Sequence, residues 1–195
     1  GIARLTFDAG RGACISFLPV MGEYTYTVHR NENLVIGETN GHSYDLAKDF
    51  HMYFAVKFDA GDIDFARTSA TCENGTEHTG LHVFLNKSAV TFRIGISYIS
   101  AELAATAAER ECGSRSFEEV FAETNAIWEE RLSRIDVRFA EDEPKMMRTF
   151  YTCLWRTFLF PHKCYELAPD GKVIHYTPID GSVHEGVRYT DNGFW

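Results

Sequence analysis

The chain has 195 residues, of which 45% are hydrophobic and 14% aromatic, and this composition supplies a substantial core and excludes a disordered chain. The formal net charge is −9 and Lys and Arg form no cluster, which argues against nucleic acid and anionic membrane surfaces as partners. No apolar run reaches the roughly eighteen residues that a membrane span needs.

Residues 1–99 alternate apolar and polar side chains with a period of two and are rich in β-branched and aromatic residues. This pattern is typical of half-buried antiparallel strands. Dipeptides such as Asn40-Gly41 and Ala60-Gly61 supply turns between them. Because no helices intervene, the spacing favours a β-sandwich. The strands are predicted at residues 2–8, 13–18, 23–30, 51–59 and 89–100.

At Ser100 the period changes. Residues 101–111 are rich in Ala and Glu and predict a helix, with Gly113 placed to end it. Ser116 opens a second predicted helix, because Glu119 three residues on completes a capping box. Residues 136–140 are predicted to be a short strand or an extended connector.

A third helix is predicted after three acidic residues and Pro144, which suit a first helical turn. Its apolar residues extend from Met147 to Phe160 and surround it almost completely, so we expect other helices to enclose it. The chain itself contains too few predicted helices to enclose this one. The predicted domains are a sandwich (1–99), a helical linker (100–140) and the start of an α-helical domain (141–195).

The five cysteines are odd in number and form no C-x-x-C pair, which disfavours a disulfide framework or a zinc knuckle. Cys153 and Cys164 flank the end of the third predicted helix, and we expect both to be small buried side chains. Unpaired thiols are compatible with a cytoplasmic protein.

Four blocks then occur in order: FRIGISYIS (92–100), WEERLSRIDV (128–137), FYTCLWRTFLFP (150–161) and YTDNGFW (189–195). Together they resemble the calcium-dependent exo-acting α-mannosidases of glycoside hydrolase family 92. The resemblance implies a mostly β fold with α: an antiparallel β-sandwich (supersandwich), linker helices and an α/α barrel. On this resemblance the chain is a fragment that holds the later part of the sandwich, the linker and the first barrel helix.

The resemblance also implies a function, the inverting hydrolysis that releases terminal α-linked mannose from glycans. The implied partners are a mannose-containing glycan and the rest of the barrel. The catalytic acid and base of the family lie further along the barrel, so we assign neither here. Calcium ligands are likewise expected outside this chain, with no metal held by it. Relatives of this kind are bacterial periplasmic or secreted proteins.

The residues predicted to bind substrate lie near the C-terminal end. Trp195 resembles the family's pocket tryptophan, whose ring can cover the apolar face of a mannose. Asp191 and Asn192 predict a turn that would aim this ring. His184 and Glu185 could serve acid–base chemistry or orient a ligand. The simpler alternative is a loop ion pair of this segment with Arg188. Neighbours in an extended segment point to opposite faces, so the two are not expected to act on one atom.

A second hypothesis comes from a different class of protein. The chain would be a non-catalytic β-sandwich module that binds carbohydrate or has a structural role, with its C-terminal helix packed on its own sheet. The position of that helix distinguishes the two hypotheses.

Overall fold

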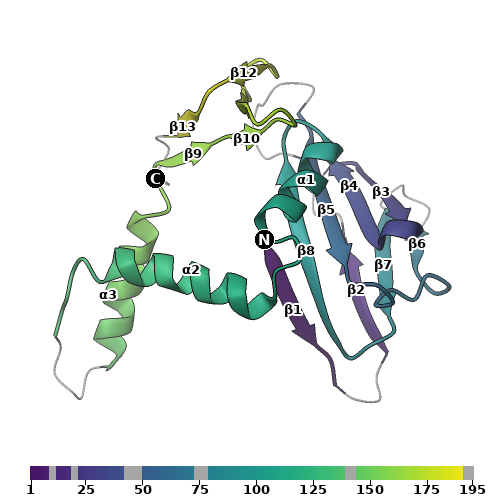
Figure 1. The fold of residues 1–195 in the computed structure, drawn as a ribbon, viewed down its shortest axis with the longest axis horizontal. Helices are drawn as coiled ribbons and strands as arrows, with labels where there is room; N and C mark the ends of the chain where they lie inside the picture. Colours follow the sequence, from purple (N-terminus) through teal and green to yellow (C-terminus); the bar gives the residue numbers. More distant parts are fainter. Residues whose placement is uncertain (9–11, 19–21, 42–49, 73–78, 139–143, 191–195) are drawn as a thin grey trace.

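The structure is a computed structural model, and it describes residues 1–8, 12–18, 22–41, 50–72, 79–138 and 144–190 (Figure 1). Antiparallel strands come first and three helices follow, so the predicted fold class is confirmed. None of the helices in these residues combines the length and the apolar composition that crossing a membrane requires.

Two antiparallel sheets make up the sandwich. The larger has the strand order β1-β8-β5-β4-β3 and the smaller the order β2-β7-β6. The strands are β1 (Ile2–Thr6), β2 (Ala13–Phe17), β3 (Tyr24–His29), β4 (Leu34–Thr39), β5 (Met52–Phe58), β6 (Ser69–Cys72), β7 (Thr79–Leu85) and β8 (Ala89–Ser97). A short 3-10 helix, η1 (Arg30–Glu32), links β3 to β4, and Asn33 after it adopts a left-handed conformation (φ 51°).

The core lies between the two sheets and follows the predicted alternation. On β5 every second side chain, including Val56 and Phe58, points into it. Phe58 packs against Phe92 of β8 with ring centroids 5.3 Å apart. The buried members of this core are Ala13, Val35, Val56, Phe58, Ile63, Leu81, Val83, Leu85, Val90 and Phe92.

Helix α1 (Ala101–Glu111) covers the outer face of the larger sheet. Its N-cap is Ser100, whose side chain accepts a hydrogen bond from the backbone of Leu103. Leu34 and Ala55 of the sheet pack against Ala104 of the helix in a second, smaller core. Helix α1 and strand β8 can approach each other closely because Gly95 of β8 has no side chain where the two cross.

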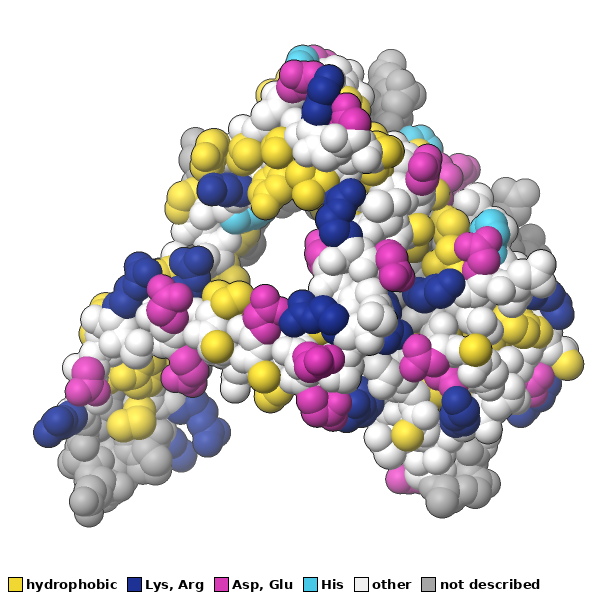
Figure 2. All heavy atoms as spheres, viewed as in Figure 1, with side chains coloured by type: hydrophobic (Ala, Val, Ile, Leu, Met, Phe, Trp, Pro, Cys, Tyr) yellow, Lys and Arg dark blue, Asp and Glu magenta, His cyan; other side chains and the backbone are white. Residues whose placement is uncertain are grey.

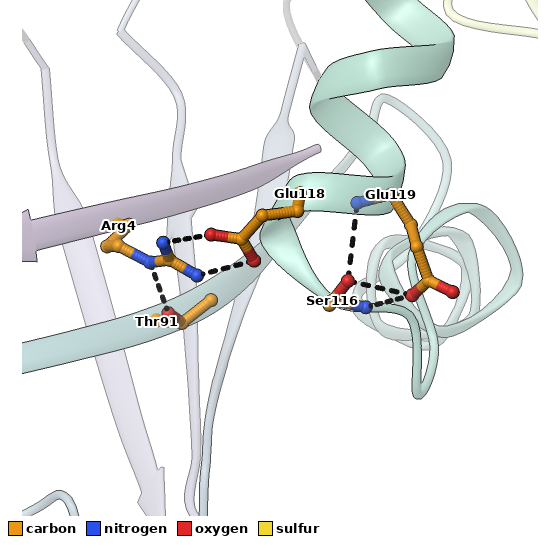
Figure 3. A network of polar contacts seen from close by, with 5 residues as sticks. All are labelled: Arg4, Thr91, Ser116, Glu118 and Glu119. Carbon is orange, nitrogen blue, oxygen red and sulfur yellow. Dashed lines mark hydrogen bonds and ion pairs between the residues drawn. The ribbon is translucent and has the colours of Figure 1, made fainter.

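Helix α2 (Phe117–Leu132) begins with the predicted capping box. Ser116 Oγ accepts from the Glu119 backbone, and the Glu119 carboxylate accepts from the Ser116 backbone (Figure 3). The first turn is tied to β1 by Arg4, whose guanidinium binds both carboxylate oxygens of Glu118 and lies 4.6 Å from the centre of the Phe117 ring. The remainder of α2 extends away from the sandwich (Figure 1).

The Arg4–Glu118 ion pair gives a testable pH dependence. The hydrogen bonds and charge of Arg4 hold the pKa of the Glu118 carboxyl below its ordinary value of 4.5. The folded state therefore gains stability from this pair above pH 4.5, and the gain is lost as the pH falls through the lowered value. We expect a carbon-detected NMR titration to show Glu118 protonating below pH 4.5, and to show its midpoint rising toward that value in Arg4→Met. An unchanged midpoint in the variant would contradict the assignment.

Among the described residues, helix α3 (Pro144–Thr157) packs against the end of α2, where the rings of Trp155 and Trp128 lie 6.0 Å apart between their centres. Figure 2 shows apolar side chains at the surface of this α2–α3 arm. The expectation that the chain supplies too few partners for this helix is thus confirmed for the described residues, in which Met146, Met147 and Trp155 are exposed.

Two predictions in this region were wrong. The helix ends at Thr157 rather than Phe160, because the chain bends before Pro161. Cys153 is exposed on α3 and Cys164 is only half-buried, since no element of the described chain covers them. Cys14 and Cys112 are free as well. Residues 136–138 form no strand, which leaves the extended connector of the two alternatives predicted for 136–140, and residues 139 and 140 lie outside the described residues.

Candidate functional site

The C-terminal strands lie beyond the end of the sandwich near α1 (Figure 1). They form two small sheets, β10-β11-β12 and β13-β9, for which the sequence analysis predicted no strands. The strands are β9 (His162–Cys164), β10 (Glu166–Leu167), β11 (Val173–Tyr176), β12 (Val183–Glu185) and β13 (Arg188–Thr190).

Glu166 fastens these strands to the sandwich. One carboxylate oxygen accepts from Ser97 Oγ at 2.5 Å and the other from the Tyr98 backbone N–H at 2.9 Å. Beside this contact, the rings of Phe50, Tyr98 and Tyr176 lie within 5.9 to 6.4 Å of one another. Three segments distant in the sequence therefore meet at one end of the sandwich.

Removing this carboxylate should loosen the C-terminal strands. In Glu166→Ala we expect the Tyr98 amide to exchange with solvent about ten to a hundred times faster, because a hydrogen bond to a charged group is worth about 1.5–3 kcal/mol. Hydrogen exchange measured by NMR checks this. Glu185→Ala, on the same small sheet, serves as the control and should leave the Tyr98 amide unchanged. Equal exchange rates in both variants would show that Glu166 does not hold the strands.

His184 belongs to a short chain of polar contacts. The Ser182 hydroxyl donates to Asp180 Oδ1 at 2.6 Å. The Ser182 Oγ atom also lies 2.7 Å from His184 Nε2. Hydrogen bonds from the Ser182 hydroxyl and backbone, with a smaller effect of His184, hold the pKa of Asp180 below its ordinary value of 3.8. Because the ionised Asp180 carboxylate accepts the hydrogen bond of the Ser182 hydroxyl, the Nε2–H of His184 must donate to Ser182 Oγ.

This order of contacts excludes a serine nucleophile at Ser182. In a catalytic triad the serine hydroxyl donates its hydrogen bond to the histidine, whereas here it donates to the Asp180 carboxylate. In the neutral form of His184 this arrangement places the proton on Nε2, which leaves Nδ1 as a hydrogen-bond acceptor. His175, its partner across β11 and β12, lies 5.7 Å away between ring centres and bonds the Gly186 carbonyl through Nδ1 at 2.9 Å.

Glu185 points away from this chain of contacts, as expected for neighbours on a strand. Its carboxylate lies 3.4 Å from Lys172 Nζ. The expected ion pair with Arg188 was wrong, because the Asp170-Gly171 turn brings Lys172 beside β12. Lys172 directly precedes β11, and it becomes a neighbour of Glu185 only because β11 pairs with β12.

Trp195, Asp191 and Asn192 lie outside the described residues. The last described strand, β13, leads directly to them, and Tyr189 on this strand is 66% exposed. The structure brings His184 and Glu185 onto one hairpin. The sequence analysis missed Asp180, Ser182 and Glu166. An Asp-Gly turn between two β-rich runs, at Asp180-Gly181, was the signal that could have found the first two.

A hollow of about 450 Å³ follows α3 and is lined by Met147, Arg148, Tyr151, Thr152 and Trp155. It is almost wholly apolar apart from Arg148 and Thr152. No three His, Cys, Asp or Glu side chains in the described ranges converge to hold a metal ion. The described residues therefore do not fit a calcium site, which needs six to eight oxygen ligands.

Comparison with known proteins bears on both halves of the chain. The glycosyl hydrolase family 92 catalytic domain matches residues 103–195. The whole chain superimposes on the family GH92 inverting mannosidase from Bacteroides thetaiotaomicron VPI-5482, with a TM-score of 0.84 and 28% identity, and covers 27% of that protein. The GH92 family glycosyl hydrolase ccman5 shares the fold over 97% of this chain, with a TM-score of 0.69, 17% identity and 27% of its own length covered.

No curated protein matches the sequence. The chain thus spans about a quarter of the length of both solved structures. The family resemblance carried by the four sequence blocks is confirmed, since three of them lie wholly within the matched residues 103–195 and the block at 92–100 falls within the shared fold. This chain is similar to the glycosyl hydrolases of family 92, in residues 103–195 by the match to their catalytic domain and along its whole length by its fold.

Proposed function

We propose that this chain forms part of a glycoside hydrolase that releases terminal α-linked mannose from glycans by inverting, calcium-assisted hydrolysis. The observation that carries the proposal is the similarity to an inverting mannosidase along the whole chain, at 28% identity and a TM-score of 0.84. The match of residues 103–195 to the family's catalytic domain supports it.

The C-terminal strands form one edge of the proposed mannose pocket. His184, held by Ser182 in the tautomer with Nε2–H, presents Nδ1 as an acceptor for a sugar hydroxyl. Trp195, Asp191 and Asn192 follow β13, where the tryptophan ring would cover the apolar face of the sugar and the turn would aim it. Glu185, in its ion pair with Lys172, keeps oxygen lone pairs for a second hydroxyl.

Inverting hydrolysis needs a carboxylic acid that protonates the leaving oxygen and a carboxylate that activates water, about 6.5–9.5 Å apart. We propose that both belong to residues outside this chain, in helices that also cover the apolar side of α3. The calcium ligands would lie there as well. Within this chain, the contribution is to bind and orient the sugar and to exclude water with aromatic rings.

Assays of the 195-residue chain and of the complete product of its gene, side by side, test the proposal. The substrates are α-1,2-, α-1,3- and α-1,6-mannobiose with calcium or with EDTA. We expect the chain alone to release no mannose, because no catalytic pair is assigned to it. The complete product should release mannose as the β-anomer first, as NMR of the fresh product shows, and chelation should reduce the rate.

Two results would contradict the proposal. Calcium-dependent release of mannose by the 195-residue chain would show that its own residues hold the catalytic pair. Release of the α-anomer first, or no cleavage of any mannoside by the complete product, would remove the inverting mannosidase assignment.

A further inference from the structure

A second, unrelated cleft lies beside α1, over the end of the larger sheet. It consists of two hollows of about 430 and 240 Å³ that share Glu32, Lys57, Arg93 and Glu109. The smaller hollow has an apolar floor formed by Leu34, Ala105 and Ala108. None of these residues belongs to the C-terminal strands, where the proposed mannose pocket lies.

Two cations face each other in this cleft. Lys57 of β5 and Arg93 of β8 are direct partners across the two strands, and both line the two hollows. Like charges at directly opposed positions destabilise a sheet unless another group lies between them. Lys57 makes no ion pair in the described part of the chain. The position therefore suits an incoming hydrogen-bond acceptor.

Arg93 also has an unmet hydrogen bond. Its side chain is buried, with the residue only 9% exposed. The Nη1 group donates to Asp59 at 2.8 Å and Nη2 donates to the Arg115 carbonyl at 3.3 Å. The Nε–H has no acceptor among the described residues. The Nε atom is covered in this structure, so a ligand oxygen reaches it only if a neighbouring side chain of the cleft moves aside, and it then satisfies a donor whose burial without a partner is costly.

The charge balance determines the class of ligand. Beside the two cations stand three carboxylates, Glu32, Asp59 and Glu109, so the cleft carries no excess of positive charge. An anion would meet these carboxylates in a protein whose net charge is −9. A neutral polyol suits the cleft better, since each hydroxyl both accepts from Lys or Arg and donates to a carboxylate. The apolar floor can receive the C–H face of a sugar ring.

We propose that this cleft is a saccharide-binding site in which a pair of neighbouring hydroxyls bridges Arg93 Nε, Lys57 Nζ and the Glu109 carboxylate. It would hold a sugar of the same glycan away from the C-terminal strands and so anchor the substrate. Only the choice of mannose as the sugar rests on the proposed function; the site itself depends on the residues of the sandwich and α1.

The test follows the Arg93 Nε–H signal in nitrogen–proton NMR spectra of the 195-residue chain. Methyl α-mannoside, methyl β-galactoside, maltose and inorganic phosphate are each titrated into it. We expect saturable shifts with methyl α-mannoside, with a dissociation constant on the order of millimolar. Both Lys57→Met and Glu109→Gln should weaken binding about tenfold, the usual effect of losing one hydrogen bond to a charged group.

Lys145→Met and Glu129→Gln are the matched controls, because they make the same substitutions on the exposed surfaces of α3 and α2. Both should bind as the parent chain does. Thermal unfolding of all four variants identifies any loss of binding that follows from loss of the fold. Arg93 itself stays in place, since its removal would leave Asp59 and Arg115 without their buried partner.

Three results would overturn the proposal: shifts that do not saturate with any of the saccharides, binding that Lys57→Met and Glu109→Gln leave unchanged, or binding of phosphate alone. Binding of maltose or galactoside without mannoside would support the site but separate it from mannose hydrolysis. Binding of mannoside by a protein that cleaves no mannoside would leave the cleft in place while the proposed function fails.

Discussion

Replacing Gly95 by valine is expected to cost the chain at least about 3 kcal/mol of unfolding free energy and to separate α1 from the larger sheet. A Cβ atom built at this position would lie 1.8 Å from the Ala104 carbonyl oxygen and 2.8 Å from the Ala108 backbone nitrogen. Both obstacles are helix backbone, so no side-chain rotation can relieve them. Urea unfolding followed by circular dichroism measures the loss.

Gly12→Ala is the control for this experiment. The nearest atom to a Cβ at Gly12 is the end of the flexible Arg67 side chain at 3.6 Å, which is an ordinary contact distance. We expect its stability to stay within about 0.5 kcal/mol of the parent chain. A Gly95→Val chain that unfolds at the parent urea concentration would show that α1 does not rest on β8.

Phe58→Ala is expected to cost about 3–5 kcal/mol. Phe58 is 2% exposed and packs against Phe92 in the middle of the core between the two sheets. Truncation removes the buried ring and leaves a cavity that neighbouring strands, fixed by their hydrogen bonds, cannot close. The same unfolding measurement gives the change in free energy.

Phe121→Ala makes the same substitution on α2, where the ring is 56% exposed and contacts Phe117. Its cost should be about 1 kcal/mol or less, because little apolar surface returns to water. If both variants lost the same stability, the core would not lie where the structure places Phe58.

The elements predicted most accurately carry their own local signals. The bounds of α1 follow from Ser100 and Gly113, and the start of α2 from the capping box of Ser116 and Glu119. The alternation on β5 and β8 likewise reflects one face in the core and one toward α1. In these cases the information lies within a few residues of the element.

Strand β4 was missed for a physical reason. Leu34 and Val35 are both buried, one beneath α1 and the other in the core, so the strand shows no alternation of apolar and polar residues. The C-terminal strands were missed because strands of two to four residues are too short to show a period. Both failures arise where tertiary contacts, rather than local pattern, fix the strand.

The candidate site was less predictable than the fold for a related reason. His184 and Glu185 are visible as a polar pair in the sequence, but their partners Ser182 and Lys172 become neighbours only when the hairpin of β11 and β12 forms. The contact of Glu166 with Ser97 joins residues 69 positions apart. No sequence pattern encodes such a contact.

The pairing of β1 with β8 bears on how the chain is made. Ile2 pairs with Arg93, so strand β1 meets β8 only after about ninety further residues have left the ribosome. Strands β3, β4 and β5 can pair as they emerge, because each neighbours the next in sequence. During synthesis the pairing of β1 with β8 thus forms only once the chain has reached Ser97, after β3, β4 and β5 have been able to pair.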